Sequence, residues 1–156
     1  MEGHSREVWA LAVSRDGQMI ASGDDGGKVI AWHGDTGESL AQPIHAHSNW
    51  IRSLDFSPDR TVLVNQSIVA VMSDRCVRYS PSRSGEFLAI ATDDNIQIYH
   101  PGTREQITSF KGHTKRNLSL AWTPDGTRLL SGGSREDPTI REWDSSDWQQ
   151  VGHPWE

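Results

Sequence analysis

The sequence repeats itself, and this repeat limits the possible folds more than any other feature. Copies begin at Gly3, Ala46 and Gly112 with "GHSREVWALAVSRDG", "AHSNWIRSLDFSPDR" and "GHTKRNLSLAWTPDG". In each copy the histidine precedes the turn aspartate by 12 residues. A fixed period predicts one structural unit per repeat, and such a unit buries its faces by stacking on its neighbours.

A fourth, degenerate copy reads "SDRCVRYSPSRSGEFLAIATDD" and starts at Ser73, with Ala70 at the histidine position. Successive histidine positions are therefore 43, 23 and 43 residues apart. This spacing predicts one domain over residues 1–156, with a shortened second repeat. The predicted repeats span about 3–45, 46–69, 70–111 and 112–156. A shortened repeat leaves strand edges that proteins normally cover.

Within a repeat, apolar residues alternate with polar ones over short runs, which indicates half-buried β-strands. In the last repeat the runs predict strands at about 117–122, 128–132, 139–143 and 148–151. Turn residues such as Pro124-Asp125-Gly126 separate them. No segment has helical periodicity with caps, so the prediction is an all-β protein of four-stranded antiparallel meanders.

The order of motifs in each repeat resembles the WD40 repeat family of β-propellers. These motifs are Gly-His, an alternating strand, a Ser-Pro-Asp-Gly turn, a Ser-Gly cluster and a strand ending in Trp-Asp. The resemblance covers nearly the whole chain. It implies that each repeat is one propeller blade and that the chain makes a half-ring of about 3.5 to 4 blades.

The same resemblance implies a buried hydrogen-bond relay of histidine, serine, aspartate and tryptophan in each complete blade. The last repeat has all four, as His113, Ser131, Asp137 and Trp143. The first keeps His4, Ser22 and Trp32, with Gly26 at the aspartate position and Asp25 beside it. The third keeps Asp93 alone. We therefore expect only the last repeat to build the relay.

A half-ring does not close, because propellers have roughly four to eight blades. A symmetric homodimer is the simplest way to close it, with Trp148 and Trp155 at the ring-closing contact. The alternative is that the chain is a fragment of a longer propeller. Both interpretations stay open at this point.

The loop after each Gly-His is the expected partner-binding face, because the family commonly uses this face for partners. Residue types differ there between repeats, and tryptophan and arginine often supply binding energy at interfaces. The candidate residues are Arg6, Glu7, Asn49, Trp50, Lys115 and Arg116. For Trp50, packing on an adjacent loop is the competing interpretation.

Composition narrows the remaining function classes. A net charge of -6 argues against nucleic-acid binding, which needs clustered Lys and Arg. The single cysteine, Cys76, excludes an internal disulfide, and no apolar run approaches the roughly 20 residues that cross a bilayer. We therefore expect no membrane association and a cytoplasmic location, with the nucleus also compatible.

Catalysis, metal binding and cofactors are not expected. His113, Ser131 and Asp137 occupy the positions of the structural relay, and the remaining histidines are spread along the chain. The acidic pairs Asp24-Asp25, Asp93-Asp94 and Glu136-Asp137 fit turn chemistry, in which aspartate bonds nearby backbone N–H groups. The functional prediction is a non-catalytic, self-associating scaffold for protein partners. The alternative is a recognition or sensor fragment of a larger multidomain signalling or regulatory protein.

Overall fold

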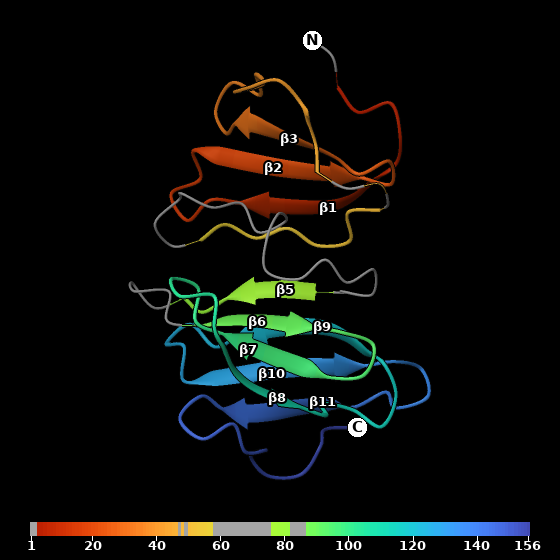
Figure 1. Cartoon of the computed structure of the whole chain (residues 1–156), viewed down its shortest axis with the longest axis vertical. Helices are drawn as coiled ribbons and strands as arrows, with labels where there is room; N and C mark the ends of the chain where they lie inside the picture. The colour runs from red at the N-terminus through yellow and green to blue at the C-terminus, as the bar shows by residue number, and fades with distance from the viewer. Residues whose placement is uncertain (1–2, 47, 49, 58–75, 82–86) are drawn as a thin grey trace. The chain divides into compact units, whose positions relative to one another are not determined.

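The computed structural model describes residues 3–46, 48, 50–57, 76–81 and 87–156. The chain divides into two compact units, Met1–Met72 and Ser73–Glu156. Within the described ranges every regular element is a β-strand, and all strand pairs are antiparallel (Figure 1). The all-β prediction is confirmed for this part of the chain.

Unit one contains a four-stranded sheet in the order β1-β2-β3-β4. Its strands are β1 (Val8–Val13), β2 (Met19–Asp24), β3 (Lys28–His33) and β4 (Ile44–His45). The β1–β2 hairpin closes at Ser14–Met19, where Gly17 has a φ of 73° that a side-chain-bearing residue rarely adopts. Asp16 accepts a hydrogen bond from the Ser14 hydroxyl and stabilises this turn.

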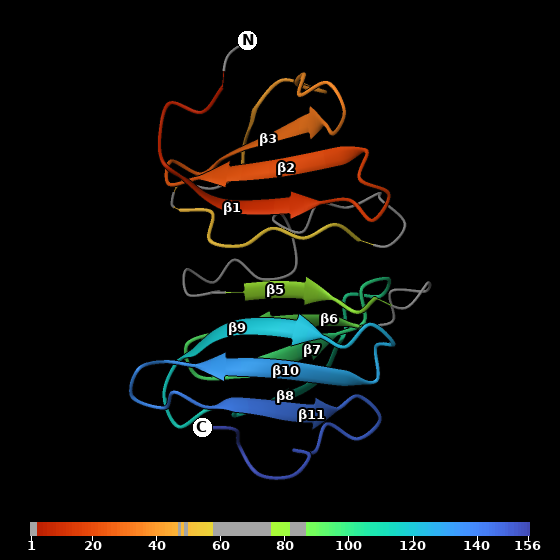
Figure 2. The ribbon, with the colours of Figure 1, turned by 180° about the vertical axis from the view of Figure 1, so that it is seen from behind.

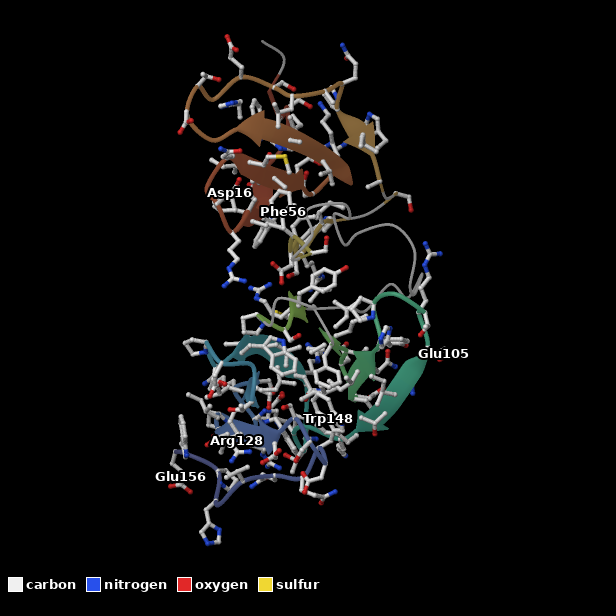
Figure 3. All side chains as sticks on the ribbon, turned by 90° about the vertical axis from the view of Figure 1, so that its left-hand side faces the viewer. Asp16, Phe56, Glu105, Arg128, Trp148 and Glu156 are labelled. Carbon is white, nitrogen blue, oxygen red and sulfur yellow. The ribbon has the colours of Figure 1, made fainter. Side chains whose placement is uncertain are left out.

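One face of this sheet carries small residues, and the segment 50–57 packs on it. The face presents Ala10, Ala12, Ala21 and Val29, and the segment contributes Ile51, Leu54 and Phe56, all buried. Figure 3 labels Phe56 in this unit. Small side chains on the sheet leave room for larger ones from the next segment, so the two layers can pack closely.

Unit two contains two sheets. The first is four-stranded, β5-β6-β7-β8, and the second is three-stranded, β11-β10-β9. Their strands are β5 (Cys76–Tyr79), β6 (Leu88–Ala91), β7 (Ile96–Tyr99), β8 (Gln106–Phe110), β9 (Asn117–Trp122), β10 (Arg128–Gly133) and β11 (Ile140–Asp144). Strand β9 lies against β5 and β6, and the view from behind in Figure 2 shows β9 and β10 in front.

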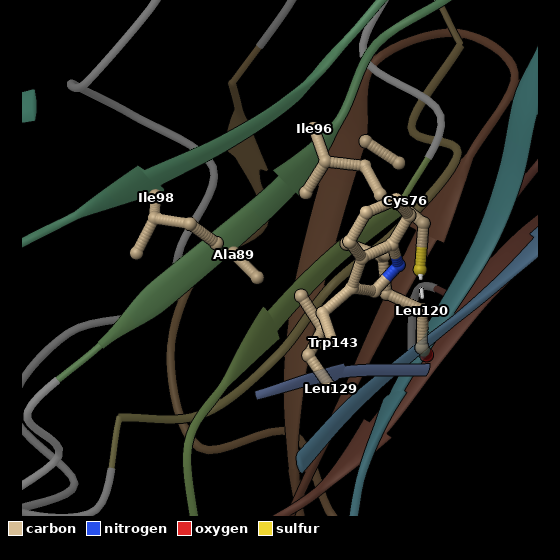
Figure 4. Packing of buried hydrophobic residues seen from close by; sticks show 8 residues of the cluster. Cys76, Ala89, Ile96, Ile98, Leu120, Leu129 and Trp143 are labelled. Carbon is tan, nitrogen blue, oxygen red and sulfur yellow. Dashed lines mark hydrogen bonds between the residues drawn. The ribbon is translucent and has the colours of Figure 1, made fainter. Parts of the chain in front are cut away.

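The core of unit two lies between these sheets. Trp143 of β11 packs with Cys76, Ile96, Leu120 and Leu129, as Figure 4 shows from close by. The Cys76 thiol is buried, with Sγ 4.0 Å from the carbonyl oxygen of Leu120. Burying a tryptophan among aliphatic side chains is a large apolar gain, so this contact joins the two sheets firmly.

The strand predicted at 148–151 is reduced to a short antiparallel pairing with β11 and is not a regular strand. The outer edge of β11 instead has two isolated bridges, Trp143 with Gln150 and Ile140 with Trp155. Trp148 has a φ of 60°, and Gly152 has a φ of 66°. These left-handed conformations cannot continue an extended strand, so the chain returns to β11 through bends.

One predicted site residue, Asn49 of the partner-binding set, lies outside the described residues. The predicted start of the third repeat, at residue 70, lies outside them as well. The repeat boundaries stay predictions. None of the described segments is a helix with the length and hydropathy needed to span a membrane.

Candidate functional site

The relay exists in the last repeat. Trp143 donates its indole N–H to Ser131 Oγ at 3.0 Å, and His113 Nε2 lies 2.9 Å from the same oxygen. Because the serine oxygen accepts from Trp143, its own proton is free to be donated to Nε2. That arrangement puts the single N–H proton of the neutral imidazole on Nδ1, which lies 3.6 Å from Asp137 Oδ2.

Asp137 is the charged end of this relay. Burial opposes its ionisation, but hydrogen bonds from the Thr114 backbone and from the Thr139 and Thr114 hydroxyls, with the charge of Arg141, hold its pKa well below the ordinary 3.8. Burial lowers the pKa of His113 below the ordinary 6.5, against the attraction of Asp137. The pair therefore favours a carboxylate beside a neutral imidazole, with Asp137 anchoring the loop that begins at Thr114.

The first repeat also builds the relay, contrary to the expectation from sequence. Trp32 donates to Ser22 Oγ at 2.7 Å, and His4 Nε2 lies 2.6 Å from that oxygen. The aspartate is Asp24 rather than a residue at position 26, with Oδ2 2.7 Å from His4 Nδ1.

The length of the turn explains this difference. Only three residues join β2 to β3, whereas six join β10 to β11. The short turn places the last residue of β2 beside the histidine, and Asp24 Oδ1 then accepts the backbone N–H groups of Gly26 and Lys28. Burial opposes its ionisation, but these bonds and the one from His4 outweigh it and lower the pKa of Asp24.

The third repeat replaces the relay with apolar packing. Ala89 and Ile98 fill the interior of the β5-β6-β7-β8 sheet and are fully buried. The Tyr99 hydroxyl instead bonds side chains of its own sheet, Gln97 and Gln106, each at 3.1 Å. The sequence prediction that this repeat lacks the four-residue set agrees with these contacts.

In unit one the predicted partner-binding residues gather around the turn that starts at Asp24. The carbonyl oxygen of Glu7 accepts the N–H of Asp25 at 3.0 Å, and Arg6 Nη1 lies 3.9 Å from the Asp25 carboxylate. The backbone of the next repeat joins the same turn, because the N–H of Ile51 bonds the Asp24 carbonyl at 3.0 Å. The relay therefore fixes this turn and the backbone bonded to it, which we call the base, and these side chains project from it.

Trp50 forms an exposed aromatic stack on this base. Its ring lies parallel to that of Trp9, with centroids 5.3 Å apart and an interplanar angle of 15°. The guanidinium carbon of Arg52 is 5.4 Å from the centre of the Trp50 ring. Trp9 and Trp50 remain 54% and 48% exposed. We name Trp9, Trp50 and Arg52 the aromatic surface.

The sequence prediction found Trp50 but missed Trp9, Arg52 and the role of Asp24. Trp9 and Arg52 share one signal, since each follows its repeat histidine by five residues, at His4 and His47. Comparing that position between repeats would have found both residues. The packing interpretation of Trp50 also describes a real contact, although the ring stacks on a strand residue rather than on a loop.

The remaining predicted residues lie in unit two. Lys115 and Arg116 are exposed in the loop before β9, and the Arg116 carbonyl accepts the N–H of Ser134. Trp148 packs with Phe87, Phe110 and Trp122 inside this unit (Figure 3). Trp155 is half exposed beside β11. Among the described residues, no three histidine, cysteine or acidic side chains are grouped as metal ligands.

Comparison with known proteins agrees with this geometry. The family model for the WD domain, G-beta repeat, matches residues 1–33, 37–100 and 104–144. The Drosophila melanogaster protein named small ribosomal subunit protein RACK1 is 31% identical over 92% of this chain and 39% of its own length. Arabidopsis thaliana FIZZY-RELATED 3 is 22% identical over 90% of this chain and 33% of its own length.

A solved structure has the same fold. The β-propeller domain of Cps50 (Swd1) from Myceliophteria thermophila superposes with a TM-score of 0.76 at 21% identity, covering 99% of this chain and 60% of that domain. The chain covers 33% and 39% of the length of the two curated relatives above. The family match, the repeated sheets and the two relays together show that the chain belongs to the WD40 repeat family.

Proposed function

We propose that this chain is a non-catalytic scaffold that binds protein partners through the aromatic surface. The observation that carries the proposal is the stack of two half-exposed tryptophans, Trp9 and Trp50, with Arg52 beside it. Large rigid rings lose little conformational entropy on binding, and tryptophan and arginine are enriched among residues that dominate interface energy. The histidine, serine and aspartate groups support this role, since they hold the base of the surface.

The surface also suggests the chemistry of the partner. Two stacked rings offer an apolar contact area, and Arg52 adds positive charge beside it. A peptide segment with an aromatic or aliphatic side chain next to a carboxylate would match both features. A cytoplasmic or nuclear location belongs to the same proposal.

Peptide selection tests the proposal without knowledge of the partner. The chain is used to select from a random peptide library, and each selected peptide is measured against Trp50→Ala, Trp9→Ala and the exposed control Leu40→Ala. We expect peptides with an apolar and an acidic residue, and a loss of affinity of about tenfold or more in either tryptophan variant. Failure to select any peptide, or equal binding to all variants, would contradict the scaffold function.

Self-association is the second part of the proposal. A chain with about half a ring of blades gains a closed ring by pairing with a second copy. Light scattering over a dilution series is expected to give a mass near twice 17.4 kDa. A folded monomer at every concentration would contradict this part and leave the peptide-binding part intact.

One observation favours a second candidate function. The chain spans 33% to 39% of the two curated relatives, so its blades correspond to part of a larger protein in those cases. On this alternative the chain is the recognition or sensor part of a larger multidomain protein with signalling or regulatory activity. Peptide binding by a strictly monomeric chain is the result that would favour it.

A further inference from the structure

In the second and last repeats, three positions on the first strand pack against the sheet of the repeat before. They are the fourth, seventh and ninth residues after the repeat histidine. We name them the first-strand face. In the second repeat they are Ile51, Leu54 and Phe56, and in the last repeat they are Asn117, Leu120 and Trp122. All six are buried or partly buried against the sheet of the repeat before.

We call the contact between a first-strand face and the preceding sheet a joint. The described residues contain two joints, and their bonds to the backbone of the preceding sheet are similar. The N–H of Ile51 bonds the carbonyl of Asp24, and the side-chain amide of Asn117 bonds the carbonyl of Thr92, both at 3.0 Å. Each acceptor lies at the end of the second strand of the preceding sheet. Gly23 makes room in the first joint, since a Cβ there would stand 2.6 Å from Ile51 Cβ. The first joint thus combines apolar side chains of segment 50–57 with small residues of the sheet, and the second has the amide of Asn117 at the position of Ile51.

The first repeat has the same apolar positions without a cover. They are Val8, Leu11 and Val13, and the last two are 67% and 59% exposed. The equivalents of Leu11 in the second and last repeats, Leu54 and Leu120, are only 2% and 4% exposed. Three branched apolar residues in water on an ordered strand cost free energy of solvation, so this face matches a joint whose second half is absent.

The last sheet has an exposed face that resembles the small-residue side of the first joint. In the first sheet, Ala10, Gly23 and Val29 lie side by side on adjacent strands. In the last sheet, Ser119, Gly132 and Ile140 have the same register. Ser119 and Ala121 are exposed, as is Ile140. We name Ser119, Ala121, Gly132 and Ile140 the small-residue face. An antiparallel bridge sets the half-exposed Trp155 beside Ile140.

We propose that the first-strand face at Val8, Leu11 and Val13 of one copy packs on the small-residue face of the last sheet in a second copy. This inference rests on the proposed self-association and names its two surfaces. The contact is head to tail, so each copy offers both halves, and a closed dimer contains two identical joints. Val8 packs over Gly132 as Ile51 packs over Gly23, beside the Ser119 hydroxyl, which stands 2.6 Å from the Cβ position of Gly132. Trp155 borders the joint.

Charge substitutions test the pairing of these surfaces. Leu11→Asp and Ala121→Arg alter exposed side chains, so the fold of each chain should survive, which a urea transition verifies. Each variant alone should weaken dimerisation by about tenfold or more, since an unpaired charge is buried at both joints. The exposed control Leu40→Asp should dimerise like the unmodified chain.

Mixing provides the decisive measurement. In a mixed dimer of Leu11→Asp with Ala121→Arg, one joint unites the two introduced charges and the other joint is unmodified. Dimers should therefore reappear when the two variants are combined, as light scattering would show. Dimerisation that ignores both substitutions would overturn the inference while self-association stands. A chain that is monomeric at the highest concentration reached overturns both, and assigns the two faces to blades elsewhere in a longer polypeptide.

Discussion

At the scale of single residues, two relays connect strands that are distant in sequence through one serine oxygen each. Ser131 bonds both His113 and Trp143, and Ser22 bonds both His4 and Trp32. In each relay a buried indole N–H and a histidine nitrogen depend on the same hydroxyl. Removing that hydroxyl leaves two polar groups without a protein partner, which costs more than a single surface hydrogen bond is worth.

Ser131→Ala is therefore expected to lower the free energy of unfolding by about 2 kcal/mol or more, because buried groups lose their bonds while the volume change is small. Urea denaturation measures the difference. The matched control is Ser109→Ala, an exposed serine on β8, which should change stability by less than about 0.5 kcal/mol. Equal effects of the two substitutions would show that the relay contributes no net stability.

Acid is expected to destabilise the chain in two stages. The pKa of His113 is lowered by burial, so the unfolded chain binds this proton first and stability falls as the pH drops below 6.5. The pKa values of Asp24 and Asp137 lie below 3.8, so their contribution is present above that pH and is lost as the pH falls further.

Urea midpoints measured at a series of pH values would follow both stages. Asp137→Asn should flatten the lower stage, because the variant has no carboxylate to protonate at this position. Asp94→Asn, at an exposed turn residue, should keep the full dependence on pH. An unchanged acid slope in Asp137→Asn would contradict the assignment of that stage to the relay.

At the scale of elements, each joint depends on small residues that let the next strand approach. In unit one this role belongs to Gly23 of β2, and in unit two a Cβ on Gly112 would stand 2.5 Å from Ile96 Cδ1. Neither glycine has a positive φ, so the requirement is for space and not for an unusual backbone. Close packing of this kind makes an added methyl group costly.

Gly23→Ala is expected to destabilise unit one by about 1 to 3 kcal/mol, because the new methyl group would overlap Ile51 and displace segment 50–57. Thermal unfolding followed by tryptophan fluorescence would measure it, since Trp50 lies in that segment. Gly3→Ala is the control, as a Cβ at Gly3 meets nothing within 4 Å. The packing argument fails if both substitutions have the same small effect.

At the scale of the whole molecule, charge and apolar surface act on self-association in opposite directions. The chain carries a net charge of -6, so two copies repel each other at low salt. The proposed joint itself is built from uncharged side chains, which salt does not weaken. The balance between these two effects gives a measurable signature for the joint.

The dissociation constant of the dimer is expected to decrease as NaCl rises from about 10 to 150 mM, because the Debye length shortens from about 30 to 8 Å and screens the repulsion. Sedimentation equilibrium at several salt concentrations would measure the change. A joint held by ion pairs would instead weaken over this range. That opposite trend would contradict the apolar joint and point to charged contacts between the copies.

The sequence by itself determined the repeat, three strands of the last repeat and the identity of most relay residues. These features follow from local rules: alternation with a period of two predicts strands, and Asp-Gly pairs predict turns. Nothing beyond a few neighbouring residues is needed for either. This is why β9 occupies the predicted 117–122, β10 extends one residue past the predicted 128–132, and β11 is shifted by one residue from the predicted 139–143.

Only the tertiary structure decided which residues meet. Asp24 is part of its relay because the short turn after β2 places it beside His4. Trp9 stacks on Trp50 because the first and second repeats are bonded to the same turn. Leu11 and Leu54 have the same place in the pattern, yet one is exposed and the other buried. Burial depends on which segment packs against the strand. The local sequence pattern is the same in both repeats, so it cannot predict whether such a segment is present.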